Sequence, residues 1–131
     1  MEFARYFSAA LLVVVIPQAV PAPRKGGNPD AATIKNPVQA TGESVAAGRR
    51  QYQRLCVRCH GTTGKGDGEA AVGSPPSSLT GDQWQFGSSD GELFSVIHHG
   101  TSQDMAGYAE RMSDTDIWNV VNYIRTLAEK P

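Results

Sequence analysis

Apolar side chains follow a helical period in three separate stretches of the chain. The first stretch has a single apolar stripe at Val45, Gly48, Tyr52 and Leu55. Its arginines fall off this stripe and are expected to face water. Thr41 or Ser44 is the predicted start of this helix, because short hydroxyl side chains cap helix N-termini. Glycine inside a helix costs about 1 kcal/mol relative to alanine, so we expect Gly48 to permit close approach of a second helix.

The second and third stretches continue the same period towards the C-terminus. The second has its apolar side at Leu93, Phe94, Val96 and Ile97. It is expected to begin at Ser89 or Asp90 and to end at Gly100, a residue type suited to helix C-termini. The third opens at Ser113 with an acidic first turn, and its stripe consists of Ile117, Val120, Val121, Ile124 and Leu127 or Ala128. These patterns predict an all-α domain over residues 43–131.

The first 42 residues lack such a period and divide into two segments. Residues 1–22 have the form of an export signal peptide: Arg5 gives a basic start, an apolar run extends from Phe7 to Ile16, and Val20–Ala22 supply a small-residue ending. The apolar run is shorter than the roughly 20 residues of a bilayer span. We therefore expect a cleaved signal, whereas an uncleaved one would leave a membrane-anchored form. Residues 23–42 are rich in proline, glycine and asparagine and are predicted to form a flexible lead.

The most informative chemistry lies at Cys56-Val57-Arg58-Cys59-His60, directly after the first predicted helix. Two thiols separated by two residues and followed at once by histidine form the attachment signal for haem c. Both thiols can add to the vinyl groups of one porphyrin edge, and the next imidazole then lies beneath the iron. Cys56 and Cys59 are therefore the expected thioether anchors of one haem, and His60 is its expected proximal ligand.

Other interpretations of this region are weaker. A thioredoxin-like redox pair requires a βαβ context, and a zinc site requires two further cysteine or histidine ligands at suitable spacing. The chain has two cysteines, and nothing around them indicates a βαβ unit. The glycine-rich run Gly61–Gly68 suggests a phosphate cradle only weakly, because no strand precedes it. We expect this run to form a flexible loop around the haem edge.

A second iron ligand is expected from the loop that follows the second predicted helix. Met105 lies there in a polar, glycine-containing stretch, and a thioether opposite histidine raises the reduction potential of a haem. Met112 is the competing methionine and is expected to fill the core. His98 and His99 are alternative ligands, which we instead expect to be exposed at a helix C-terminus, where the dipole favours them.

The amino-acid composition limits the classes of binding partner and the size of the core. The formal net charge is −1, so no global field favours nucleic acid or an anionic membrane surface. The 131 residues, 40% of them hydrophobic, suffice for one small domain with a small core. A covalently held haem would add a large apolar group to that core.

From about Asn36 to Leu127 the chain resembles the class I cytochromes c, in the short bacterial group related to cytochrome domains of cbb3-type oxidases and periplasmic dehydrogenases. The resembling segments are residues 48–52, 56–60, 64–68, 93–97, 105–108 and 117–125. In that family the distal methionine is followed by proline, whereas Ala106 stands here. The resemblance implies that the first and last helices cross at the glycine. Gly48 and Tyr52 would then meet Val120 and Tyr123.

The resemblance also implies supporting residues around the cofactor. A proline carbonyl would accept a hydrogen bond from the proximal histidine and so fix its orientation. Pro75 or Pro76 is expected in this role, and the spacing to Leu79 leaves the choice open. Trp84 resembles a tryptophan that reaches a haem propionate; simple packing against the haem or the core is the alternative.

These features predict an exported, periplasmic, monohaem electron carrier, not an enzyme. Its partners would be redox proteins met in transient complexes, and the mature form is expected to be a monomer without a membrane span. The exposed arginines are either a docking surface or a solvated helix face: Arg49, Arg50, Arg54 and Arg58. One alternative is a peroxidase-like haem enzyme with an open distal site, if Met105 is not bound. The other is an electron-delivering subunit of a dehydrogenase or oxidase complex.

Overall fold

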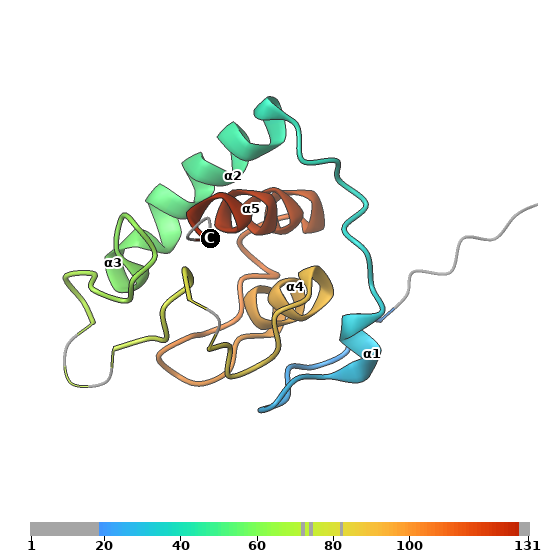
Figure 1. Cartoon of the computed structure of the whole chain (residues 1–131), viewed down its shortest axis with the longest axis horizontal. Helices are drawn as coiled ribbons and strands as arrows, with labels where there is room; N and C mark the ends of the chain where they lie inside the picture. The colour runs from blue at the N-terminus through green and yellow to red at the C-terminus, as the bar shows by residue number, and fades with distance from the viewer. Residues whose placement is uncertain (1–18, 72, 74, 82, 129–131) are drawn as a thin grey trace, which may run out of the picture.

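The computed structural model describes residues 19–71, 73, 75–81 and 83–128. Five helices make up its regular structure: α1 (Pro29–Ala32), α2 (Gly42–Leu55), α3 (Val57–His60), α4 (Asp90–His99) and α5 (Asp114–Leu127). In the described ranges no strand forms, and an isolated antiparallel bridge joins Gly100 to Ala106. α5 lies between α2 and α4 (Figure 1). The predicted all-α architecture is confirmed.

Short polar side chains begin the three long helices, as their sequence predicts. The Thr41 hydroxyl accepts a hydrogen bond from the Ser44 amide at the start of α2. Ser89 and Ser113 begin α4 and α5 in reciprocal capping boxes with Glu92 and Asp116, respectively. Each box satisfies backbone amides that have no partner inside the helix. The helix starts are therefore determined locally.

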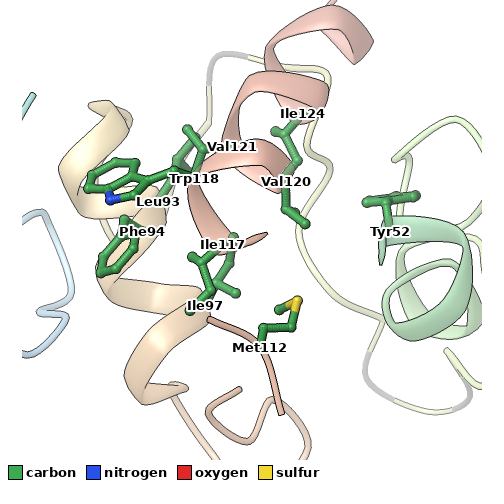
Figure 2. Close-up of a cluster of buried hydrophobic side chains, with 10 residues drawn as sticks. All are labelled: Tyr52, Leu93, Phe94, Ile97, Met112, Ile117, Trp118, Val120, Val121 and Ile124. Atoms are coloured by element: carbon green, nitrogen blue, oxygen red, sulfur yellow. The ribbon is translucent and has the colours of Figure 1, made fainter. Parts of the chain in front are cut away.

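The core is formed by the apolar faces of α4 and α5 together with Tyr52 of α2. Its buried members are Tyr52, Leu93, Phe94, Ile97, Met112, Ile117, Trp118, Val120, Val121 and Ile124. Figure 2 shows Met112 among these side chains, and its exposed fraction of 5% confirms the prediction that it fills the core. The rings of Phe94 and Trp118 stack with centroids 4.1 Å apart, which joins α4 to α5.

The helices α2 and α5 cross at Gly48, as expected. A Cβ atom on Gly48 would overlap the backbone carbonyl of Asn119 and lie 3.0 Å from the Cβ of Tyr123. The rings of Tyr52 and Tyr123 meet with centroids 5.2 Å apart. The predicted contact with Tyr123 is therefore present. The nearest atoms to Gly48, however, belong to Asn119, where we expected Val120.

A network of hydrogen-bonded polar side chains lies at this crossing of α2 and α5. The Ser44 hydroxyl donates to Oδ1 of Asn119 at 2.6 Å and accepts from Nδ2 of Asn122 at 2.8 Å. Asn122 also donates to the carbonyl of Val38 at 3.0 Å, and its own Oδ1 accepts from Asn36 at 2.8 Å. Every buried amide here has a partner, so burial of these polar groups does not carry the cost of unsatisfied ones.

The segment 23–42, expected to be a flexible lead, is instead packed against α4 and α5. Its Asn28 is buried, begins the short helix α1, and donates its backbone amide to Oε1 of Glu92 at 2.9 Å. α1 lies so close to α4 that a Cβ on Gly91 would overlap backbone atoms of Ala31. Hydrogen bonds from polar groups hold this segment against α4 and α5, so its sequence needs no regular apolar period. The spacing of apolar residues therefore did not predict that the segment is packed.

The predicted signal peptide falls mostly outside the described residues, since residues 1–18 are not among them. Its last part is described. The carbonyl of Pro21 accepts from the Ser95 hydroxyl, and Nε2 of His99 lies 2.8 Å from the carbonyl oxygen of Val20. Across the described part of the chain, no helix combines the length and apolar character needed to cross a bilayer.

Candidate haem site

The residues of the Cys-x-x-Cys-His sequence lie on one tight turn at the end of α2. Cys56 terminates α2 and begins α3, and its carbonyl accepts from the amides of Cys59 at 3.1 Å and His60 at 2.9 Å. The two cysteines are half-buried and not joined in a disulfide. Both thiols and the imidazole are therefore held within one short helical segment, and the thiols remain free to bond to a common partner.

Burial sets the protonation of Cys56 and His60. Burial, with a smaller contribution from neighbouring Cys59, raises the pKa of the Cys56 thiol to about 12, so it is a neutral thiol at physiological pH. Burial also lowers the pKa of His60, so its imidazole is neutral. A neutral ring nitrogen is the form that binds a metal. Nδ1 of His60 is buried and has no hydrogen-bond partner among the described residues.

The glycine-rich run turns back over α3 and satisfies its carbonyls. The amide of Gly66 donates to His60 at 2.9 Å, that of Gly68 to Cys59 at 3.2 Å, and that of Ala70 to Arg58 at 2.9 Å. A Cβ on Gly68 would overlap the backbone of Arg58. These amides point at the protein's own carbonyls, so they do not form a phosphate cradle. The run is held against α3, where we expected a flexible loop.

The expected support of His60 by a proline carbonyl is not formed in this structure. Neither Pro75 nor Pro76 accepts from Nδ1 of His60, which has no partner in the described ranges. The carbonyl of Pro76 is directed instead against the backbone of Gly66, close enough that a Cβ there would overlap it. The nearby amide of Leu79 donates to the Gly64 carbonyl at 2.6 Å. The proline segment is thus joined to the glycine-rich run.

Met105 lies in the loop between α4 and α5, half-buried and outside the core cluster that contains Met112. Its carbonyl accepts from the amide of Thr101 at 2.9 Å, and its amide donates to the hydroxyl of Ser102 at 3.2 Å. The bridge between Gly100 and Ala106 closes the base of this loop. The two methionines are therefore clearly separated in role: one fills the core, and the other sits in a hydrogen-bonded loop.

Two tyrosine hydroxyls whose role was not predicted from the sequence hold the ends of the cysteine turn. Tyr52 donates to the carbonyl of Gly61 at 2.8 Å, and Tyr108 donates to the carbonyl of Leu55 at 3.2 Å. Burial raises the pKa of both hydroxyls, so they remain protonated donors. Both tyrosines lie within the resembling segments, 48–52 and 105–108, and Tyr52 also lies on the apolar stripe of the first predicted helix, but neither signal indicated these hydrogen bonds.

The structure also gives the surroundings of the remaining candidates, Trp84, His98 and His99. Trp84 is half-buried and packs against the core cluster. His98 stacks on Phe94 with ring centroids 5.6 Å apart, and its Nε2 lies 3.9 Å from Asp114. His99 is exposed. Among the described residues, no three or more His, Cys, Asp or Glu side chains gather as a metal-binding group.

The residues of the turn fit a covalently attached haem. The thiols are unbonded, and the imidazole is neutral, the form in which a ring nitrogen can bind iron. The family model described as "Cytochrome C oxidase, cbb3-type, subunit III" matches residues 43–124. This range includes most of α2, the cysteine turn, the Met105 loop and most of α5.

Curated relatives agree with this match. The cbb3-type cytochrome c oxidase subunit FixP of Bradyrhizobium sp. (strain ORS 278) is 34% identical over 86 residues, which cover 66% of this chain and 28% of the relative. Subunit CcoP of Azospirillum sp. (strain B510) is 30% identical over 86 residues, which cover 63% of this chain and 28% of the relative. The chain thus spans less than a third of the length of these relatives.

Solved structures share the fold. The Kuenenia stuttgartiensis reducing HAO-like protein complex Kustc0457/Kustc0458 aligns with a TM-score of 0.67 at 25% identity, over 75% of this chain and 49% of that chain. Cytochrome cL of Methylophaga aminisulfidivorans aligns with a TM-score of 0.57 at 20% identity, over 79% of this chain and 60% of that chain. The latter likeness concerns the fold alone.

A helical domain whose first and last long helices cross beside a Cys-x-x-Cys-His turn has the fold of the class I cytochromes c. The chain belongs to the family of cbb3-type cytochrome c oxidase subunit III, whose cofactor is haem c.

Proposed function

We propose that this protein is an exported, monohaem electron carrier. The observation that carries the proposal is the α3 turn, which presents two unbonded thiols and a neutral imidazole together. In this assignment Cys56 and Cys59 hold the haem by thioether bonds, and His60 is the proximal ligand. Met105 is the distal ligand, since it lies in a closed loop while Met112 is used by the core.

The bound haem supplies reversible one-electron exchange, and the chain's residues make that exchange easy. His60 is held by its turn and Met105 by its loop, so neither ligand needs to move far between oxidation states. A Met105 thioether bound together with the His60 imidazole would raise the reduction potential of the haem, and apolar packing around the haem would lower the local polarity. If His60 and Met105 both bound the iron, no position would remain for a substrate, which is why we propose a carrier and not an enzyme.

A second candidate is an electron-delivering module within a larger complex. The names of the relatives support it, because they are oxidase subunits and a component of an HAO-like complex. Weak, transient docking with a separate redox protein is the expected behaviour of a free carrier. Size-exclusion chromatography of the natively expressed protein separates the two: a free carrier elutes alone, and a module elutes with fixed partners.

Export to the periplasm is part of the proposal, because haem c is attached outside the cytoplasm in bacteria. Residues 1–22 are the proposed signal peptide. N-terminal sequencing of the mature protein tests this assignment. A start at residue 23 supports cleavage after Ala22, and an intact Met1 in a membrane fraction indicates an anchored form.

The decisive experiment is expression of the full chain in a bacterium that carries a c-type haem maturation system. We expect a red periplasmic protein whose mass exceeds that of its processed polypeptide by one haem, with the spectrum of six-coordinate iron. Cys56→Ala and Cys59→Ala should each keep at most one thioether and yield much less haem-loaded protein. A colourless protein with the mass of the polypeptide alone overturns the proposal. Rapid CO binding to the reduced wild type would instead favour a peroxidase-like enzyme.

A further inference from the structure

Tyr108 is the point at which the Met105 loop contacts the helix that precedes the cysteine turn. Its hydroxyl donates to the carbonyl of Leu55 at 3.2 Å. Leu55 is the last residue of α2, and the final carbonyls of a helix lack partners within it. The tyrosine therefore satisfies a group that the helix cannot satisfy itself.

The backbone and ring of Tyr108 are held from several sides. Its amide donates to the carbonyl of Ile97 at 2.9 Å, and its carbonyl accepts from the amide of Met112 at 2.9 Å. The guanidinium carbon of Arg111 lies 4.3 Å from the centroid of its ring. The hydroxyl is thus presented to α2 by a fixed side chain.

The other hydrogen bonds of this loop do not reach α2. Those of Thr101, Ser102 and Met105 close on the loop itself, and the amides of Tyr108 and Ala109 reach α4. Among the described residues, the Tyr108 hydroxyl alone makes a hydrogen bond from this loop to α2. Tyr52, by contrast, joins α2 to Gly61, and its hydroxyl makes no hydrogen bond to the Met105 loop among the described residues.

We propose that Tyr108 is a positioning residue that couples the Met105 loop to the haem-attachment turn through the carbonyl of Leu55. Tyr108 follows Met105 by three residues, and Leu55 directly precedes Cys56. The hydrogen bond therefore spans the two segments that supply the proposed distal and proximal ligands. It keeps the loop close enough for Met105 to stay bound. This inference rests on the proposed ligation by Met105.

The test compares Tyr108→Phe with Tyr123→Phe in the haem-loaded full chain. Both variants lose one hydroxyl, but that of Tyr123 makes no hydrogen bond among the described residues. Two readouts are used: amide hydrogen exchange of segments 55–61 and 101–108, and the affinity of the oxidised protein for imidazole. We expect Tyr108→Phe to speed exchange in both segments and to tighten imidazole binding about fivefold, the size of one ordinary hydrogen bond. Tyr123→Phe should match the wild type in both readouts.

The outcomes separate this inference from the proposed function. Faster exchange confined to 101–108, or unchanged exchange in both segments, overturns the coupling. Unchanged imidazole affinity in Tyr108→Phe also overturns it. If the wild type binds imidazole as readily as Met105→Ala, ligation by Met105 fails. The exchange measurement then still decides whether Tyr108 joins the two segments.

Discussion

Gly48 of α2 and Asn119 of α5 meet at the helix crossing with no room for even a methyl group between them. A Cβ on Gly48 would overlap the carbonyl oxygen of Asn119, which is backbone and cannot rotate away. The side chain of the same asparagine accepts from the Ser44 hydroxyl at 2.6 Å. One residue of α5 therefore fixes the separation of the helices through its backbone and their register through its side chain.

The first prediction concerns this contact. Gly48→Ala should lower the free energy of unfolding by about 1–3 kcal/mol, because overpacking forces the two helices apart. Chemical denaturation of the haem-loaded protein measures this change in the free energy of unfolding. Gly42→Ala is the matched control, since a Cβ there meets nothing within 4 Å. It should leave stability unchanged or raise it slightly, because alanine favours the helix. Equal stability of the two variants would contradict the close crossing.

The two methionines give the second prediction. Met105→Ala should abolish the weak long-wavelength absorption band of sulfur-ligated ferric haem and lower the reduction potential, with little loss of stability. Met112→Ala should keep the band but cost about 2–5 kcal/mol, because it leaves a cavity in the core. Spectroscopy, redox titration and denaturation separate the two effects. Loss of the band in Met112→Ala alone would reverse our assignment.

The third prediction concerns acid stability. Burial would raise the pKa of Glu92, but hydrogen bonds from Ser89, Asn28 and Ser88 outweigh it and hold the pKa below its ordinary value of 4.5. A depressed folded pKa means that ionised Glu92 stabilises the fold above pH 4.5. This stabilisation is lost as pH falls from there through the folded pKa.

Denaturation at a series of pH values tests this linkage. Glu92→Gln should be less stable than the wild type at neutral pH by about 1–3 kcal/mol, and its stability should fall less steeply in acid. The exposed Glu69, replaced by glutamine, is the control and should keep the wild-type slope. If Glu92→Gln follows the wild type at every pH, the buried carboxylate does not hold the lead.

The fourth prediction concerns the base of the Met105 loop. Gly100 has a φ of +76°, and a Cβ there would lie 2.5 Å from the carbonyl oxygen of Met105. Gly100→Ala should therefore weaken the sulfur-ligation band and increase imidazole binding. Gly26→Ala is a suitable comparison, because its φ is +82° but a Cβ meets nothing within 4 Å. It should strain the backbone locally and leave the band intact. Weakening of the band by both would indicate general destabilisation.

The sequence predicted well those features whose causes are local. The caps at Thr41, Ser89 and Ser113 depend on residues three positions apart, so they could be recognised directly. The cysteine turn is likewise a matter of adjacent residues. Gly48 signalled a close approach because glycine is costly within a helix.

Side-chain hydrogen bonds that join distant parts of the chain were not predicted, although the resemblance did imply the helix crossing at Gly48. Asn119 and Ser44 are 75 residues apart, and polar side chains on a helix normally indicate a solvated face. Glu92 was not singled out from the sequence, and its partner Asn28 is 64 residues away. The Tyr108 hydroxyl reaches 53 residues back to Leu55. Such contacts depend on how the helices pack against one another. The spacing of apolar residues within a single helix does not show this.

The packed lead also alters where the independently folding unit begins. The family match starts at residue 43, so a truncation designed from homology alone would remove Asn28 and Asn36. Glu92 would lose a buried amide donor, and Asn122 would lose the donor to its Oδ1. A shortened version would keep every proposed haem ligand and still expose part of its interior.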